Sequence, residues 1–441
     1  MKKRIMACLL ASLPLTMAAQ RQWTLKQCID YALENNITLK TARLQQMSAA
    51  EEVAGSKAQL LPTLNASTNH SLGYRPWQDK GTTTVTNGQV NAKMDKHYYN
   101  GSYGLNASWT VWNGNRNRNN IVLSKYSEQQ ASLNIDQTAN SIQEEIARYY
   151  VQILYLKEAV KVSQASLETS RKNEERGEQM VQVGKMSKAD LAQLSAQRAS
   201  DEYNIVEAQS QVATYLLRLK QLLELPGDEQ LDVATPSATN EQALQAIPPL
   251  QAVYQAALAS RPEIASAQVA IKSSDVSLKV AKGGWLPTLS MSSGIGTSTN
   301  SLSNNSFGNQ LKFNFDGSVG ATLSIPILDQ RTVKTNVAKA RLQQSQAQLD
   351  LEDQQKKLYQ TIESCWLDAQ NNQQKYRAAT KTVESEQQSY DLLQEQFRLG
   401  LKNIVELMTG KDRLLSAQQN MLQAKYVTIL NQHLLKFYAG Q

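Results

Sequence analysis

Cysteine and histidine are scarce in this chain of 441 residues, which has 3 of each. Cys8 lies near the N-terminus, and Cys28 and Cys365 are far apart in sequence, so we expect no disulfide framework and interpret the latter two as small buried hydrophobic residues. The histidines are also isolated: His70, His97 and His433. No spacing typical of metal ligands is therefore present, and the sequence predicts neither a metal site nor another cofactor.

A long apolar run is absent after the first 20 residues, so the mature sequence offers no candidate transmembrane helix, and a membrane role would require strands. The formal net charge is +7, with basic residues scattered among acids, which excludes a basic stripe for nucleic acid. Thr409-Gly410-Lys411-Asp412 lacks the glycine spacing and the preceding strand of a phosphate-binding loop. With no other catalytic constellation, we expect a protein that is not an enzyme.

The N-terminus has the pattern of a secretory signal peptide over residues 1–19. Basic Met1-Lys2-Lys3-Arg4 precedes an apolar stretch, and Ala18-Ala19 supplies small residues before Gln20. Cys8 comes too early for a lipoprotein cysteine, so we expect no N-terminal lipid.

The rest of the chain is internally duplicated. Leu61-Pro62-Thr63-Leu64 recurs as Leu286-Pro287-Thr288-Leu289, and further along Gly184 corresponds to Gly400. Self-similarity at this period indicates one structural unit built twice. We expect a first repeat over 20–225, a polar connector over 226–250 and a second repeat over 251–441.

Each repeat has two stretches in which apolar and polar residues alternate, as in strands with one apolar face. They cover about 63–74 and 102–111, then 288–295 and 311–325, with polar loops predicted at 75–97 and 299–310. Alternation predicts Leu105, Leu289, Phe313 and Leu323 on the apolar face. It predicts Asn106, Ser290 and Asn314 on the polar face.

An ordinary half-exposed antiparallel sheet explains this alternation as well as a membrane barrel does. The signal peptide, the polar loops and the aromatic residues at the strand ends favour the barrel. Four strands cannot close a barrel in lipid, so several chains would share one.

The strands are followed by long helical patterns, predicted at 116–183 and 187–225 and again at 332–398 and 404–437. Apolar residues of the first pattern repeat with the 4-3 spacing of a coiled coil: Ile135, Ile142, Ile146, Tyr149, Ile153, Leu156, Val160 and Leu167. A helix of this length would extend on the order of 100 Å. Each repeat is thus expected to contain a long antiparallel helical hairpin.

The turns of these hairpins share a motif. Gly184 and Gly400 stand where a left-handed residue would end the first helix, and Ser187 and Asn403 stand where the next helix would be capped. An acid follows each cap, Asp190 and Glu406, in the position of a capping box. Helix capping alone would account for both acids.

With these features the sequence resembles the TolC-like outer-membrane efflux proteins, over nearly the whole mature chain. The most specific matches are the repeated Leu-Pro-Thr-Leu, the turns Trp112-Asn113-Gly114 and Leu328-Asp329-Gln330, and the hairpin turns 183–191 and 399–407. The resemblance implies a mostly α-helical protein with a membrane β-barrel. A homotrimer would share 12 strands in that barrel, which an α-helical tunnel would continue across the periplasm.

The resemblance also implies a function and a site. We expect an outer-membrane exit channel that conducts solutes passively, with a periplasmic adaptor, an inner-membrane pump and outer-membrane lipid as partners. Gly184, Lys185, Gly400 and Leu401 would meet the adaptor. Pore constriction or gating is expected from three residues: Glu406 on an acidic ring, Asp190 on the first turn, and Lys402 linked to Asp190.

Thr409 stands where the family's second ring acid would be, so the sequence departs from the usual double ring at this position. A secreted coiled-coil structural protein or adhesin without a pore is the alternative. It would explain the helices but would not require four alternating strands.

Overall fold

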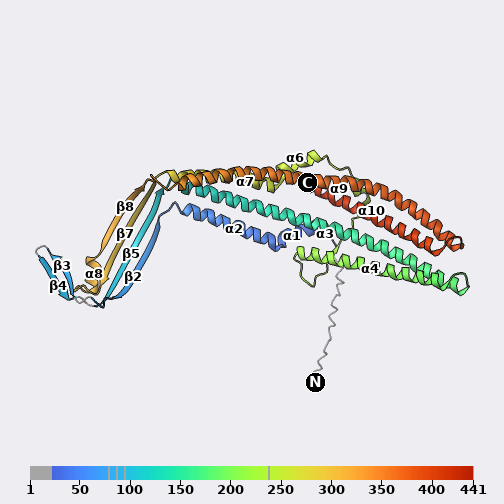
Figure 1. Ribbon diagram of the computed structural model, residues 1–441, viewed down its shortest axis with the longest axis horizontal. Coiled ribbons are helices and arrows are strands. Elements are labelled where there is room, and N and C mark those ends of the chain that lie inside the picture. The colour runs from blue at the N-terminus through green and yellow to red at the C-terminus, as the bar shows by residue number, and fades with distance from the viewer. Residues whose placement is uncertain (1–21, 78–79, 86–87, 94–95, 237–238, 441) are drawn as a thin grey trace, which may run out of the picture. The chain divides into compact units, whose positions relative to one another are not determined.

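The computed structural model describes residues 22–77, 80–85, 88–93, 96–236 and 239–440 (Figure 1). The predicted signal peptide at 1–19 lies outside these residues. The chain forms two compact units, and each draws segments from both halves of the sequence. The first, called the helical unit, comprises Met1–Arg43, Asn134–Ile264 and Gln354–Gln441, and the second, called the sheet unit, comprises Leu44–Leu133 and Ala265–Asp353.

The sheet unit is built on one four-stranded antiparallel sheet. Its strands are β2 (Thr63–Tyr74), β5 (His97–Trp112), β7 (Thr288–Asn300) and β8 (Asp316–Ser324), in the order β2-β5-β7-β8. Two strands come from each half of the sequence, and the central pair β5–β7 joins the halves (Figure 1). The helices that lead into the sheet include α2 (Ile37–Ala58), α7 (Pro262–Lys282) and the short 3₁₀ helix Gly283–Trp285.

The register of this sheet confirms the predicted apolar face. Directly opposed residues in an antiparallel pair share a face, and Ala66 lies opposite Leu105, which lies opposite Ile295. Leu289 lies opposite Leu323 in the same way. Leu105, Ile295 and Leu323 are 43%, 47% and 60% exposed, so apolar side chains cover a surface that nothing in the single chain buries.

The other face of the sheet is polar and carries small residues. Asn65 lies opposite Asn106, Asn106 opposite Gly294, and Gly294 opposite Ser318. Ser290 lies opposite Thr322 on this face, as the alternation predicts.

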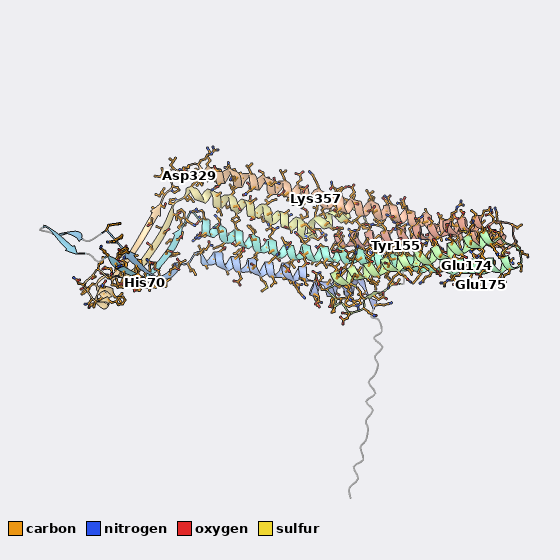
Figure 2. The ribbon with its side chains drawn as sticks, turned by 60° about the horizontal axis from the view of Figure 1, so that its bottom comes forward. His70, Tyr155, Glu174, Glu175, Asp329 and Lys357 are labelled. Atoms are coloured by element: carbon orange, nitrogen blue, oxygen red, sulfur yellow. The ribbon has the colours of Figure 1, made fainter. Side chains whose placement is uncertain are left out.

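His70 lies on strand β2 (Figure 2). Its Nδ1 is 2.6 Å from the Tyr99 hydroxyl and its Nε2 is 2.9 Å from the Thr68 hydroxyl. The contact with Tyr99 joins β2 to β5, whereas Thr68 lies on the same strand as His70.

Two expectations for this unit were wrong. The predicted polar loop 75–97 contains a hairpin of β3 (Lys80–Val85) and β4 (Gly88–Lys93). A run of β-branched residues up to Val85, followed by Asn87-Gly88, was the sequence signal for it.

The strand predicted from 311 begins only at Asp316, because helix α8 (Phe307–Phe313) occupies its first residues. Ser306 caps α8 by accepting from the backbone N–H of Asn309 at 3.4 Å. Phe313 therefore lies in a helix, not on the apolar face of a strand. Asn314 ends that helix and donates to the Ser298 carbonyl at 2.6 Å, so the polar-face prediction for it was also wrong.

The helical unit contains most of both long hairpins. The first helix of each hairpin begins in the sheet unit and continues in the helical unit from Asn134 and from Gln354. The first pairs α3 (Arg116–Gln182) with α4 (Lys188–Leu222), and the second pairs α9 (Thr332–Arg398) with α10 (Ile404–Tyr438). α3 and α9 have 67 residues each, and α4 and α10 have 35 each. Of the eight residues with the coiled-coil spacing, Ile135, Tyr149 and Val160 are half-buried. The other five are buried: Ile142, Ile146, Ile153, Leu156 and Leu167.

The sequence from Thr24 to Ala58 has a helical pattern, and the structure divides this segment at Asn36 into α1 (Leu25–Asn35) and α2. The Asn36 side chain accepts from the backbone N–H groups of Thr38 and Leu39 at 2.9 and 3.3 Å. It also donates to the Leu222 carbonyl at 3.0 Å, which ties the break to the end of α4. Asn36 thereby restarts the helix as a cap.

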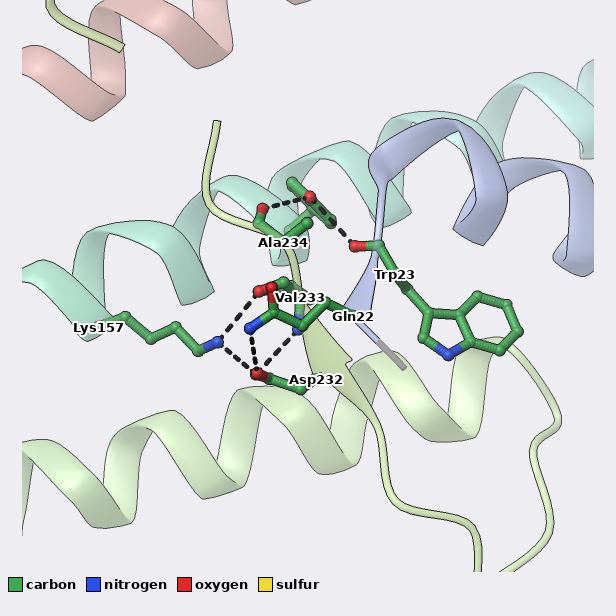
Figure 3. A network of polar contacts seen from close by, with 7 residues as sticks. Gln22, Trp23, Lys157, Asp232, Val233 and Ala234 are labelled. Carbon is green, nitrogen blue, oxygen red and sulfur yellow. Dashed lines mark hydrogen bonds and ion pairs between the residues drawn. The ribbon is translucent and has the colours of Figure 1, made fainter. Parts of the chain in front are cut away.

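The connector between the repeats contains strand β6 (Asp232–Val233) and α5 (Thr239–Ala243), and α6 (Leu250–Ser260) follows at the start of the second repeat. β6 pairs in parallel with β1 (Gln22–Trp23). The Tyr150 hydroxyl lies 3.2 Å from the Trp23 carbonyl and 2.7 Å from the Ala234 carbonyl, and Lys157 forms an ion pair with Asp232 (Figure 3). These contacts fasten both strands to α3.

Both described cysteines are buried and free, as the sequence predicts. Cys28 packs in a core with residues of α1, α3 and α4, and Cys365 packs in a second core with residues of α6 and α10. Burial raises the thiol pKa of Cys28 to about 12 and that of Cys365 to about 11, so neither is a reactive thiolate.

Candidate functional site

The two hairpin turns have the same backbone geometry. Gly184 and Gly400 adopt φ values of 72° and 75°, in the left-handed region where glycine carries no Cβ penalty. The Lys185 N–H donates to the Met180 carbonyl at 2.8 Å and the Gly184 N–H to the Val181 carbonyl at 3.0 Å, which is a Schellman motif. Leu401 and Gly400 repeat both bonds in the second turn, at 2.9 and 3.0 Å.

The helices that leave the turns are capped as the sequence predicts. The Asn403 side chain accepts from the Glu406 N–H at 2.9 Å, and the Glu406 carboxylate accepts from the Asn403 N–H at 3.2 Å, so the capping box is complete. In the first turn the Ser187 hydroxyl accepts from the Asp190 N–H at 3.1 Å, but it also donates to the Asp190 carboxylate at 2.8 Å. Asp190 therefore contacts the hydroxyl of the cap residue, and this cap differs from the full box.

Glu406 is held in its charged form by two neighbours. Lys402 Nζ donates to Glu406 Oε1 at 2.5 Å, and the side chains are 38% and 39% exposed. The bond from Lys402, then the backbone bond from Asn403, lowers the pKa of the Glu406 carboxyl below its ordinary value. Glu406 is thus an ionised acid at the start of α10 over the whole neutral range.

Lys402 does not make the predicted bond to Asp190 inside the chain, because the structure pairs it with Glu406. The link between these two residues from one chain to another stays a prediction. One turn after Glu406, Thr409 donates its hydroxyl to the Val405 carbonyl at 2.7 Å. Of the two positions 406 and 409 in the first turns of α10, only 406 therefore carries an acid.

Exposed apolar side chains surround the turns. Val183, Leu399, Leu401 and Val405 are 67%, 59%, 70% and 58% exposed, and Lys185 is also exposed. A Cβ built on Gly184 or Gly400 would meet nothing within 4 Å. The turns are open to a partner on this side.

Behind the turns the two hairpins share an apolar cluster. Its buried members come from α4, α9 and α10: Leu194, Tyr390, Phe397, Ile404, Leu407 and Leu414. Met186 and Met408 pack against it. We call this set the tip cluster, and it joins the first hairpin to the second within the helical unit.

Sequence reasoning missed a polar group near this cluster. Lys411 is 5% exposed and forms an ion pair with Asp201, which is 2% exposed. The signal was present, because Lys411 stands four residues after Leu407 and three before Leu414, on the apolar stripe of α10.

The described residues contain no group of three or more His, Cys, Asp or Glu that could hold a metal ion. Among the same residues, no helix is both long enough and apolar enough to cross a membrane.

The duplicated long hairpins, the four-stranded sheet with an exposed apolar face and the open turns define the class of outer-membrane channel proteins. A family model described as "Outer membrane efflux protein" matches residues 28–224 and 253–441. The chain belongs to this family.

Named relatives agree with this assignment. The outer membrane efflux protein BepC of Brucella suis biovar 1 is 23% identical over 99% of this chain and 89% of its own length. The alkaline protease secretion protein AprF of Pseudomonas aeruginosa is 23% identical over 93% of this chain and 82% of its own. The crystal structure of the outer membrane protein VceC from Vibrio cholerae superposes with a TM-score of 0.76 at 16% identity, covering 94% of this chain and 96% of that one.

The protein is therefore an exit channel of the outer membrane that serves tripartite efflux or secretion. It is a transport protein, and its family works with adaptor and pump partners. The adhesin alternative is excluded by this membership.

Proposed function

We propose that the two hairpin turns form the periplasmic entrance of the channel, with Glu406 as its charged constriction and Lys402 as the residue that sets its state. The observation that supports this most is the pairing of Lys402 with Glu406, which places an ionised carboxylate and a lysine bound to it at the start of α10. In a threefold assembly Glu406 would be present three times around one axis. Repeated negative charge in a narrow opening favours cations.

The same turns are proposed to bind the periplasmic adaptor, and through it the inner-membrane pump. Gly184, Lys185, Gly400 and Leu401 lie at the turns, where exposed apolar side chains are combined with a basic residue. A cluster of this kind fits a protein partner better than it fits water. Asp190 is proposed to contact Lys402 of a neighbouring chain when the entrance is closed.

The sheet is proposed to span the outer membrane as one third of a shared barrel. β2 and β8 are the edges of the four-stranded order, and exposed edges are not tolerated in lipid. Three chains would close 12 strands into one barrel, with the apolar face toward lipid and the Asn106 face toward the lumen. The repeats at 20–225 and 251–441, joined by the connector at 226–250, would each supply two strands and one hairpin to this assembly.

Adaptor binding can be tested with Leu401→Asp in the full-length protein. We expect this variant to assemble as a trimer but to lose adaptor in co-purification from crosslinked cells. Phe307→Asp is the matched control, because Phe307 is 56% exposed but belongs to α8 of the sheet unit. Equal adaptor recovery with both variants would refute the contact, and a monomer in mild detergent would refute the shared barrel.

A further inference from the structure

Three helices each contribute one polar side chain to a buried group beside the tip cluster. Ser170 comes from α3, Asp201 from α4 and Lys411 from α10. They are 2%, 2% and 5% exposed. Two belong to the first hairpin and one to the second.

The polar atoms of these three side chains are hydrogen-bonded to one another and to Gln197. Lys411 Nζ donates to Ser170 Oγ at 2.5 Å and also bonds to Asp201 Oδ2. Ser170 Oγ donates to the same Asp201 oxygen, and Gln197 donates to the other one at 3.3 Å. The charges of Lys411 and Asp201 are thus compensated without water.

The group is not a product of the internal duplication. At the offset that aligns Gly184 with Gly400, Lys411 corresponds to Ser195 and Asp201 corresponds to Ala417. The charged pair therefore exists once per chain, and it connects the two hairpins instead of stabilising each of them.

The buried group lies close along α10 to Glu406, the residue proposed to line the entrance. Lys411 is five residues beyond Glu406 on the same helix, a rise of about 7.5 Å. Apolar contacts of the tip cluster tolerate sliding of one helix on another, whereas a buried ion pair with hydrogen bonds requires one geometry. The pair is thus suited to fix the height and rotation of α10 against the first hairpin.

We propose that Ser170, Asp201 and Lys411 are positioning residues that lock the second hairpin onto the first and so limit how far Glu406 can move when the channel opens. The proposal rests on the function proposed above for Glu406. The part of α10 that moves during opening would then end at Lys411.

The test compares Lys411→Met with Arg198→Met in the full-length trimer. Arg198 forms ion pairs with Glu174 (Figure 2) at 2.6 Å and with Glu202 at 2.9 Å, both inside the first hairpin. Arg198→Met therefore also removes a basic residue, but it leaves the contacts between the two hairpins intact. For Lys411→Met we expect at least tenfold faster amide hydrogen exchange over residues 404–414 and at least twofold higher single-channel conductance. For Arg198→Met we expect neither change.

A double variant separates positioning from stability. Asp201→Leu with Lys411→Met replaces the pair by apolar side chains and leaves no unpaired charge, so it should fold even if the single variant does not. We expect it to keep a melting temperature near that of the wild type while exchange at 404–414 and conductance stay raised. Wild-type exchange and conductance in the double variant would overturn the proposal, because the residues would then only fill the core.

Glu406→Gln is measured alongside to keep the two hypotheses apart. If it leaves ion preference unchanged while Lys411→Met accelerates exchange, the lock is supported and the role of Glu406 fails. If it alters ion preference while both Lys411 variants behave as wild type, the lock fails and the entrance stands.

Discussion

Lys402 and Glu406 form a hydrogen-bonded ion pair of 2.5 Å across the first turn of α10, in which the same carboxylate also accepts from the Asn403 backbone. One acid thus completes a helix cap and carries a charge at the hairpin turn. Capping by itself would explain its presence, so its effect on ions has to be measured.

Replacing Glu406 by glutamine should lower the cation preference of the channel. The amide keeps the side-chain length and can still accept from the Asn403 N–H, but it removes the charge. Reversal potentials in asymmetric salt measure the effect in planar bilayers. An unchanged preference in Glu406→Gln would leave Glu406 as a cap only.

The pH dependence of this preference follows from the lowered pKa of Glu406. Its ordinary value is 4.5, so the carboxylate should stay charged as the pH falls through the mildly acidic range, and cation preference should be lost only below about 4.5. The stabilising contribution of Glu406 has the same sign: present at neutral pH and lost as the pH falls through the folded-state pKa. Lys402→Met removes the largest cause of the lowered Glu406 pKa. As the pH falls, the cation preference of this variant should therefore disappear at a higher pH than that of the wild type.

Reversing the charge of Lys402 should open the entrance further. In Lys402→Glu the bond to Glu406 is replaced by repulsion, and any link from Lys402 to Asp190 of another chain is lost as well. An exposed pair contributes little by itself, but a trimer would contain it three times. We expect higher single-channel conductance, and a conductance equal to that of the wild type would show that Lys402 does not restrain the entrance.

The face of the sheet can be tested on neighbouring residues of β8. Leu323 shares the exposed apolar face with Leu289, whereas Thr322 shares the polar face with Ser290. Leu323→Arg should lower the free energy of unfolding by about 2–4 kcal/mol if it lies near the membrane midplane, and Thr322→Arg by much less. Fluorescence-monitored denaturation of the reconstituted trimer provides the measurement, and equal losses would refute the assignment of the faces.

Asn314 is unsuitable as the polar-face control, although alternation alone assigns it to that face. Period-two alternation predicts a strand from Leu311, but Ser306 supplies a helix cap and residues 307–313 form α8. Short amphiphilic runs of this kind fit a strand or a helix turn equally well, and the capping bond decides between them. Thr322 lies within β8 and avoids this ambiguity.

Local patterns in the sequence determined the long helices, the alternating strands and the turns of this protein. Gly184 and Gly400 adopt left-handed backbone angles because glycine allows them, and Asn403 with Glu406 forms a capping box because the residues are three apart. These effects act within a few residues, so spacing suffices to predict them.

Only the tertiary structure decided which distant residues meet. It divided the helical segment 25–58 at Asn36, where the side chain donates to the carbonyl of Leu222. It also buried Lys411 against Asp201, residues 210 apart in sequence. Local spacing places Lys411 on the apolar stripe of α10, but its partner depends on the packing of helices that are far apart in the chain, and no local spacing encodes that partner.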